Sequence, residues 1–255
     1  MAQVAHDFAA HDLALSSPDL EVVPDHASTQ TSTLALNQTS TQAPAQTMAD
    51  LLAHPALRRL GEDLAPVPAG VPTWSRAELT GRLCELSAGP DGALLSAAMS
   101  VVLDAQLAGD PVAWVSATAA TFYPPDAAAC GVDLAALVVV RTGNARAAGR
   151  AADVLLRSGA YGLVVLDLGT SAALPTPLQA RLVQLASKHD AAVLCLTDKP
   201  PEMASLGSLV SLRGQARRQR RPGGSFTCRI GILKDKRRGP GWSAAETRRG
   251  PEGLH

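Results

Sequence analysis

The sequence has almost no lysine over most of its length, because the first lysine in the 255 residues is Lys188. Aromatic residues are also scarce, at 3% of the chain. No apolar run approaches the ~18 residues that a membrane-spanning helix needs, and no basic-plus-apolar leader is present. We therefore expect a cytoplasmic protein in which lysine-dependent chemistry is unavailable before residue 188.

Residue types that commonly build metal or covalent sites are present without the spacing that such sites require. The four cysteines form no C-x-x-C pair, and three of them lie in apolar, strand-like runs, which favours buried free thiols over a disulfide or a zinc site. The six histidines show no ligand spacing, and no serine lies in a G-x-S-x-G elbow. We expect no metal, no cofactor and no nucleophilic hydrolase site.

The net charge is zero, but the charges are segregated along the chain. Residues 1–50 contain six acids and no Lys or Arg, whereas residues 211–255 contain twelve Lys or Arg against three acids. Such asymmetry indicates a basic C-terminal surface that could meet an acidic partner or nucleic acid. Residues 1–47 are also of low complexity and offer little apolar surface, so we expect them to be disordered.

An alternation of apolar runs and helical patterns follows a lead-in at residues 48–80. In the lead-in, Pro55 begins one predicted helix, and Ser75 with Glu78 forms a capping box for another that ends at Gly81. Strands are predicted at 82–87, 111–116, 136–141, 162–169 and 191–197, with helices at 93–108, 143–158 and 176–188. Near-continuous apolar strands between helices predict an α/β fold with a mostly parallel sheet covered on both faces.

The C-terminal part of the chain changes character. Residues 208–213 and 226–235 alternate apolar and polar side chains, which predicts an antiparallel hairpin at one edge of the sheet. Gln215 to Gly224 is expected to be a basic loop between them. The core is thus predicted to span 81–235, and residues 236–255 are expected to be a basic, loosely ordered tail.

The turn after the first predicted strand has the position of a phosphate-binding P-loop but lacks its charge. That loop requires G-x-x-x-x-G-K-S/T, because backbone amides cradle the phosphates and the lysine neutralises them. Here Gly89, Pro90, Asp91 and Gly92 give the turn, and Ala93, Leu94 and Leu95 follow where the lysine is needed. Ser96 could match the magnesium-binding hydroxyl, although a serine on an apolar helix is usually a tolerated helix residue.

With these elements placed, residues 70–245 resemble the ATPase core of the RecA family. The segments that resemble the family are GRLCELSAGP, then AAGRAADVLLRSGAYGLVVLDLG with Asp167 at the Walker B position, and LVSLR and KDKR near the end. The chain is more closely similar to the ImuA and SulA branch of that superfamily. The resemblance implies a RecA-like fold with a degenerate nucleotide site, and partners that include RecA, an ImuB-type Y-family-like protein and an error-prone polymerase.

Several departures from the family pattern predict that the domain does not catalyse hydrolysis. Losing the P-loop lysine should remove several kcal/mol of transition-state stabilisation. The second strand should end in a carboxylate, but WVSATAAT offers Ser116, Thr118 and Thr121 instead. Asp167 could still hold magnesium or merely cap a turn. The two connections that would be DNA-binding loops in RecA, GTSAALPTP and DKPPEMASLG, are short and not basic.

The strongest remaining signal for binding is the basic C-terminal region. Its residues are Arg213, Arg217, Arg218, Arg220 and Arg221 in one group, and Lys234, Lys236, Arg237 and Arg238 in another. They could bind DNA phosphates, dock to an acidic partner, or simply be solvated surface. Under the RecA resemblance, Lys234 and Lys236 could be a remnant of a contact with a neighbouring subunit's nucleotide.

These observations lead to one preferred hypothesis and two alternatives. The preferred one is a non-catalytic adaptor in DNA-damage-induced (SOS) mutagenic translesion synthesis that binds RecA, the ImuB–polymerase assembly, or both. The first alternative is a SulA-like inhibitor of the cell-division GTPase. The second is a DNA-binding RecA paralogue with residual nucleotide binding.

Overall fold

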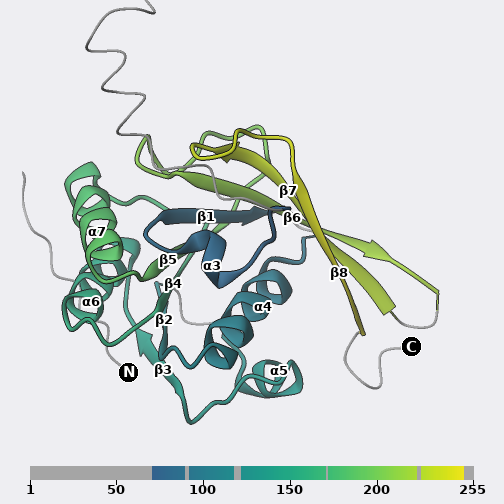
Figure 1. Ribbon diagram of the computed structural model, residues 1–255, viewed down its shortest axis with the longest axis horizontal. Coiled ribbons are helices and arrows are strands. Elements are labelled where there is room, and N and C mark those ends of the chain that lie inside the picture. The colour runs from purple at the N-terminus through teal and green to yellow at the C-terminus, as the bar shows by residue number, and fades with distance from the viewer. Residues whose placement is uncertain (1–70, 90–91, 118–121, 171, 223–224, 250–255) are drawn as a thin grey trace, which may run out of the picture. The chain divides into compact units, whose positions relative to one another are not determined.

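The computed structural model describes residues 71–89, 92–117, 122–170, 172–222 and 225–249 (Figure 1). The predicted disordered tail over 1–47 and the predicted helix that begins near Pro55 lie outside these ranges, as do Pro90 and Asp91. No helix within the described ranges is long and apolar enough to cross a bilayer.

Eight strands in the described part of the chain form one sheet with the order β3-β2-β4-β5-β1-β6-β7-β8. The strands are β1 (Leu83–Ala88), β2 (Val112–Ser116), β3 (Leu137–Arg141), β4 (Leu163–Gly169), β5 (Ala192–Asp198), β6 (Leu212–Arg220), β7 (Ser225–Asp235) and β8 (Ser243–Arg249). The strands from β3 to β6 in that order are parallel, whereas β7 and β8 add antiparallel to β6. The predicted fold class, α/β with a RecA-like sheet and an antiparallel edge, is confirmed.

Helices cover both faces of the parallel part of the sheet (Figure 1). One face packs against α4 (Leu94–Leu107), and the other packs against α6 (Ala145–Arg157) and α7 (Thr176–Lys188). Along β1, Leu83 contacts the α6–α7 side, and the next residue, Cys84, contacts the α4 side. Burial on both faces explains why these strands read as uninterrupted apolar runs.

Two short helices complete the described elements, α3 (Arg76–Leu79) and α5 (Pro124–Ala129). Helix α3 lies where it was predicted, and Gly81 follows it with a φ of +70°. The capping box was wrong in its detail, because the Ser75 side chain makes no capping hydrogen bond. The Glu78 carboxylate is turned to other partners, described below.

The expectation of buried free thiols is confirmed for Cys84, Cys195 and Cys228, and Cys130 is free and partly exposed. Burial raises the pKa of the Cys228 thiol to about 11, with the Glu246 carboxylate adding to the effect. A thiol in this state is inert near neutral pH because the thiolate is the reactive form.

The C-terminal region is more ordered than the sequence predicted. The expected basic loop from Gln215 is wrong as far as Arg220, since these residues continue strand β6. The expected loosely ordered tail is wrong over 243–249, which form β8. Both errors have one cause: these strand segments leave polar and charged side chains exposed, so they lack the apolar pattern that marks a buried strand.

Candidate functional site

Gly89 and Gly92, in the connection between β1 and α4, lie close together. The Gly92 amide donates to the Gly89 carbonyl at 2.9 Å. A Cβ atom on Gly92 would lie 2.1 Å from the Cβ atom of Ala88, so only glycine fits at this position. Helix α4 then begins at Leu94 without a side-chain cap. Ser96 lies in the first turn of α4, partly buried, and its carbonyl accepts a 3.1 Å hydrogen bond from the Ser100 hydroxyl.

Asp167 lies at the carboxyl end of β4, where the resemblance to RecA places a Walker B aspartate. It is 2% exposed and pairs in register with Ser116 at the end of β2. The Ser116 hydroxyl accepts a hydrogen bond from the Trp114 indole at 3.2 Å. Because β1, β2 and β4 are parallel, their carboxyl ends bring Asp167, Ser116 and the Gly89–Gly92 turn to the same edge of the sheet. A hydroxyl therefore stands where the family pattern has a carboxylate.

The chemistry of this edge is limited. A strand-end aspartate can hold magnesium when phosphates and a lysine complete the site. The residues that open α4 are Ala93 and Leu94, which carry no charge. Within the described ranges, no group of three or more His, Cys, Asp or Glu side chains is arranged to hold a metal ion. Gly92, Ser116 and Asp167 thus lie at the edge where the resemblance to RecA places a nucleotide site, but the residues that open α4 supply none of its positive charge.

A buried ionic cluster next to this edge was not predicted. Its centre is Glu85 on β1, which is fully buried. The Glu85 carboxylate accepts hydrogen bonds from the Thr197 hydroxyl at 3.0 Å and the Leu206 amide at 2.9 Å, and the Lys199 ammonium lies 2.5 Å from it. A charge inside an otherwise apolar strand, LCELSA, was the signal in the sequence, since a buried carboxylate must find partners.

Arg213 on β6 joins this cluster instead of forming part of a binding surface. It is 5% exposed, and its guanidinium lies 4.0 Å from the Glu85 carboxylate. It also donates to the main-chain carbonyls of Met203 at 2.5 Å and Pro200 at 3.3 Å. Glu85 and Arg213 therefore attach the connection after β5, residues 199–211, to the sheet.

Lys234 and Lys236 hold the same connection from β7 and the turn after it. The Lys234 ammonium donates to the Gly207 carbonyl at 3.4 Å, and the Lys236 ammonium donates to the Ser208 carbonyl at 2.6 Å. Burial lowers the pKa of Lys234, and the positive charge of Lys236 lowers it further. Both lysines are thus engaged within their own chain.

A second buried ion network joins α3, β1 and β7. Arg82 is 2% exposed, and its guanidinium donates to the Asp235 carboxylate at 2.6 Å and to the Ser211 carbonyl at 2.8 Å. It also lies 3.4 Å from the Glu78 carboxylate, the residue expected to complete a capping box. Burial alone would raise the pKa of Asp235, but hydrogen bonds from the Arg237 amide, Arg82 and Trp242 outweigh it and hold that pKa below its ordinary value.

Arg237 and Arg238 extend this network. The Arg237 guanidinium donates to the Thr80 carbonyl at 3.1 Å, and the Arg238 guanidinium pairs with the Glu78 carboxylate at 3.2 Å. We call Lys234, Lys236, Arg237 and Arg238 the inner basic group, because each contacts main-chain or acidic groups of the same domain.

The remaining arginines lie on the far ends of β6 and β7 and are exposed. We call them the outer arginine group: Arg217, Arg218, Arg220, Arg221 and Arg229. Arg229 was not predicted, because only strand pairing places it directly opposite Arg217. These two arginines line a depression of about 330 Å³ together with Gln215, Leu233 and Ser243.

Some of the outer arginine group have contacts within the ribbon. The Arg218 guanidinium stacks 4.3 Å from the centre of the Phe226 ring, and Arg221 donates to the Thr227 hydroxyl at 2.5 Å. No ion pair involves Arg217, Arg220 or Arg229 among the described residues. Like charges placed directly opposite on neighbouring strands repel, so Arg217 and Arg229 present a site suited to an anion.

Comparison with known proteins gives a partial relationship. The chain is 34% identical to the protein RecA of Mycolicibacterium gilvum over 121 residues, which is 44% of this chain and 34% of that RecA. It is 32% identical to the protein RecA of a Picosynechococcus species over 120 residues, again 44% of this chain and 34% of the relative. The match thus spans about a third of the length of these proteins, and no protein-family model matches the chain. Together with the order of the sheet, these similarities support a relationship to the RecA superfamily.

Proposed function

We propose that the protein is a cytoplasmic, non-catalytic adaptor of RecA type that acts in DNA-damage-induced (SOS) mutagenic translesion synthesis. In this role it would bind RecA, an ImuB-type protein with its error-prone polymerase, or both. The observation that carries the proposal is the edge formed by the Gly89–Gly92 turn and Asp167. This edge lies where the resemblance to RecA places a nucleotide site, whereas Ala93, Leu94 and Ser116 stand in place of the charged residues that hydrolysis needs.

The state of the 199–211 connection supports an adaptor over a filament-forming recombinase. The resemblance to RecA gives this connection the position of a DNA-binding loop. Here Glu85, Arg213 and the two lysines of the inner basic group tie it to the sheet, and its only basic side chain, Lys199, contacts Glu85. A connection held in this way has little freedom to wrap a DNA strand.

The outer arginine group supports a role in binding. Arg217, Arg220 and Arg229 are exposed and have no acidic partner within the described ranges, so their charges are available to another molecule. Positive surfaces of this kind raise association rates with acidic proteins and with nucleic acid. We propose that this surface contacts the partner, with the inner basic group serving stability instead.

The test is a pull-down with the full-length chain against purified RecA, an ImuB-type protein and the polymerase, with and without single-stranded DNA. Binding should weaken in a variant with Arg217→Gln, Arg220→Gln and Arg229→Gln. A matched control carries Arg141→Gln, Arg146→Gln and Arg150→Gln, which remove the same charge from exposed positions on β3 and α6. Deletion of residues 211–255 would be uninformative, because it removes three strands of the sheet.

Two results would overturn the proposal. One is ATP hydrolysis by the purified chain at a rate comparable to that of RecA, with or without DNA. The other is a failure to bind RecA or the translesion proteins combined with retention of the cell-division GTPase, which would identify a SulA-like inhibitor.

Direct DNA binding is a second candidate function, and the facing pair Arg217 and Arg229 favours it. Such binding needs only a positive surface and weakens steeply with salt as counterions are released. In that case the triple variant of the outer arginine group should bind DNA more weakly and with a shallower salt dependence, while the α6 and β3 control should not.

A further inference from the structure

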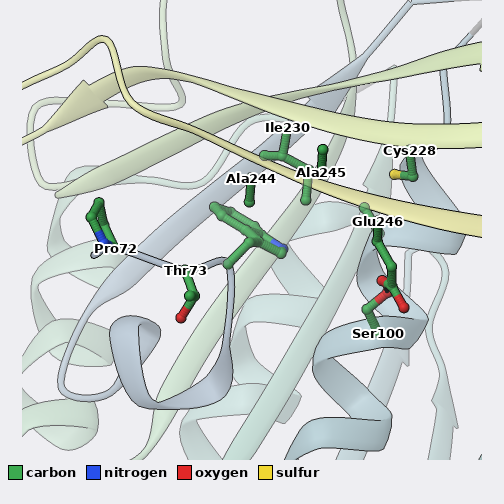
Figure 2. Close-up of a pocket in the computed structure, with 10 residues that line it drawn as sticks. Pro72, Thr73, Ser100, Cys228, Ile230, Ala244, Ala245 and Glu246 are labelled. Carbon is green, nitrogen blue, oxygen red and sulfur yellow. Dashed lines mark hydrogen bonds between the residues drawn. The ribbon is translucent and has the colours of Figure 1, made fainter. Parts of the chain in front are cut away.

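A cavity lies beneath the last strand of the sheet, between β8 and helix α4. It has a volume of about 270 Å³. Its walls are mainly apolar or small, with Ala97 from α4, Ile230 and Cys228 from β7, and Ala244 from β8. Figure 2 shows Pro72 and Thr73 at one end of it and the facing pair Ser100 and Glu246 at the other.

Two buried hydrogen-bond donors next to this cavity have no acceptor within the described residues. The first is the indole Nε1 of Trp74, a residue that lines the cavity and is only 8% exposed. The second is Nε of Arg248, whose Nη2 atom donates to the Ser100 hydroxyl at 2.6 Å. Leaving a buried donor unpaired costs about 1–3 kcal/mol, so the Trp74 N–H in the cavity wall favours a ligand that supplies an acceptor oxygen.

The strand that roofs the cavity is also an edge. Strand β8 pairs with β7 on one side and with no other strand of the described chain. An unpaired edge offers a row of peptide groups to an incoming strand. In strand addition, main-chain hydrogen bonds supply affinity, and a pocket for alternate side chains supplies selectivity. The edge and the cavity occur together here.

The charges around β8 favour a negatively charged partner. No acidic residue occurs between Met203 and Lys234, and Arg229 of the outer arginine group lies on β7 directly opposite Ala245 of β8, with the rest of the group one strand further away. On β8 itself, the Glu246 carboxylate is already paired, 2.8 Å from Arg248 and 2.7 Å from the Ser100 hydroxyl. Glu246 thus offsets the charge of Arg248 but not that of the exposed arginines, which favours acidic side chains on an incoming segment.

We propose that β8 and this cavity form a docking site for an extended, acidic segment of a partner protein that carries one aliphatic side chain. The segment adds to the free edge of β8, and its aliphatic side chain enters the cavity. A cavity of ~150 Å³ lined by apolar groups already admits benzene, so a space of about 270 Å³ has room for a leucine-sized group. A main-chain carbonyl of the segment accepts from the Trp74 indole. The site stands on its own observations and does not depend on the role proposed in translesion synthesis.

The probe for the test is an acetylated and amidated octapeptide of alternating Glu and Leu, titrated into the full-length chain by calorimetry. Two control peptides separate the contributions: alternating Glu and Ser removes the aliphatic groups, and alternating Lys and Leu reverses the charge. The Glu-Leu peptide should bind at least about tenfold more tightly than either control, because the Glu-Ser peptide lacks the apolar anchor and the Lys-Leu peptide carries the opposite charge. Amide exchange should slow along 243–249 and not along β3.

Two variants locate the contact. Ala244→Leu fills the cavity and should weaken binding of the Glu-Leu peptide by about tenfold, whereas Ala128→Leu on exposed α5 should leave it unchanged. Trp74→Phe keeps a smaller aromatic ring and removes the donor, so a loss of at least about fivefold is expected from one hydrogen bond. Its thermal unfolding reports independently on whether the fold is intact.

Three results would overturn the inference. Equal affinity for the Glu-Leu and Glu-Ser peptides would show that charge alone is recognised. Slowed exchange on β3 instead of β8 would place the peptide at the opposite edge of the sheet. A stable dimer of the chain, detected by sedimentation and broken by Ala244→Leu, would show that a second copy occupies the site.

Discussion

The outer arginine group lies on β6 and β7 and the inner basic group at the end of β7 and in the turn after it, and although both groups are basic, their environments are opposite. The inner group faces Glu78 and the main-chain carbonyls of residues 80, 207 and 208. The outer group faces solvent, and two of its members face each other. A run of basic residues therefore acquires its role from what the fold places opposite it, and charge density alone does not distinguish a structural cation from one available to a partner.

The largest effect on stability is expected from a substitution in the buried ion network that the inner basic group extends. Replacing Arg82 by Met leaves the buried Asp235 carboxylate without its cation and Glu78 with Arg238 alone, which should lower the free energy of unfolding by about 3–5 kcal/mol. Urea unfolding measures this. The matched control is Arg157→Met, because Arg157 forms an exposed pair with Asp153 and should cost less than about 1 kcal/mol. Equal losses in the two variants would contradict the distinction.

The next largest effect on stability is expected at the 199–211 connection, which two lysines of the inner basic group contact. Glu85→Gln removes the charge that faces Lys199 and Arg213, so we expect a loss of about 3 kcal/mol in the free energy of unfolding. The connection should also open locally, and limited proteolysis should then cleave within residues 199–211 before the rest of the domain. The exposed substitution Glu202→Gln in the same connection is the control and should not accelerate cleavage.

A smaller effect on the free energy of unfolding is expected when the pH is lowered. The pKa of Asp235 lies below its ordinary value of 3.8 in the folded chain, so its contribution to stability is complete above that value and is lost as the pH falls through the lower, folded pKa. The gap in free energy of unfolding between the native chain and Asp235→Asn should therefore narrow on acidification from about pH 6 to about pH 3. A gap that stays constant or widens would show that Asp235 does not titrate in this way.

The smallest effect on stability is expected from the outer arginine group. Arg217→Gln with Arg229→Gln relieves a like-charge pair, so the free energy of unfolding should rise or remain the same within about 0.5 kcal/mol. Binding to an acidic partner should nevertheless weaken and lose part of its salt dependence. A marked loss of stability would mean that these arginines have structural partners like those of the inner group.

Most of the parallel half of the domain could be predicted from the sequence because β1, β2, β4 and β5 are buried on both faces and α6 and α7 are amphipathic. The Gly89–Gly92 turn and Asp167 also lie at the predicted edge, since chain order fixes the carboxyl ends of parallel strands. The C-terminal ribbon could not be predicted as well. Gln215 to Arg220 and the residues of β8 lack apolar alternation, and their strand state depends on partners distant in the sequence.

The burial of charged residues was the other limit of prediction. Arg213 was expected at a binding surface but lies under the 199–211 connection, and Glu85 was overlooked. Both depend on a contact between β1 and β6, which are separated by most of the domain. The local sequence gives the charge of a side chain, whereas the order of the strands in the sheet determines which counter-ion lies next to it.

The position of β1 in the sheet also determines when the domain can form during synthesis. Strand β1 is made early but lies between β5 and β6, and Arg82, the residue before it, pairs with Asp235, 153 positions later. Contacts of such long sequence separation slow folding, because a large loop must close before they form. Until β6 emerges from the ribosome, one edge of β1 has no partner and is open to mispairing with other chains. The β6 edge of β1 is therefore covered only after most of the domain has been made.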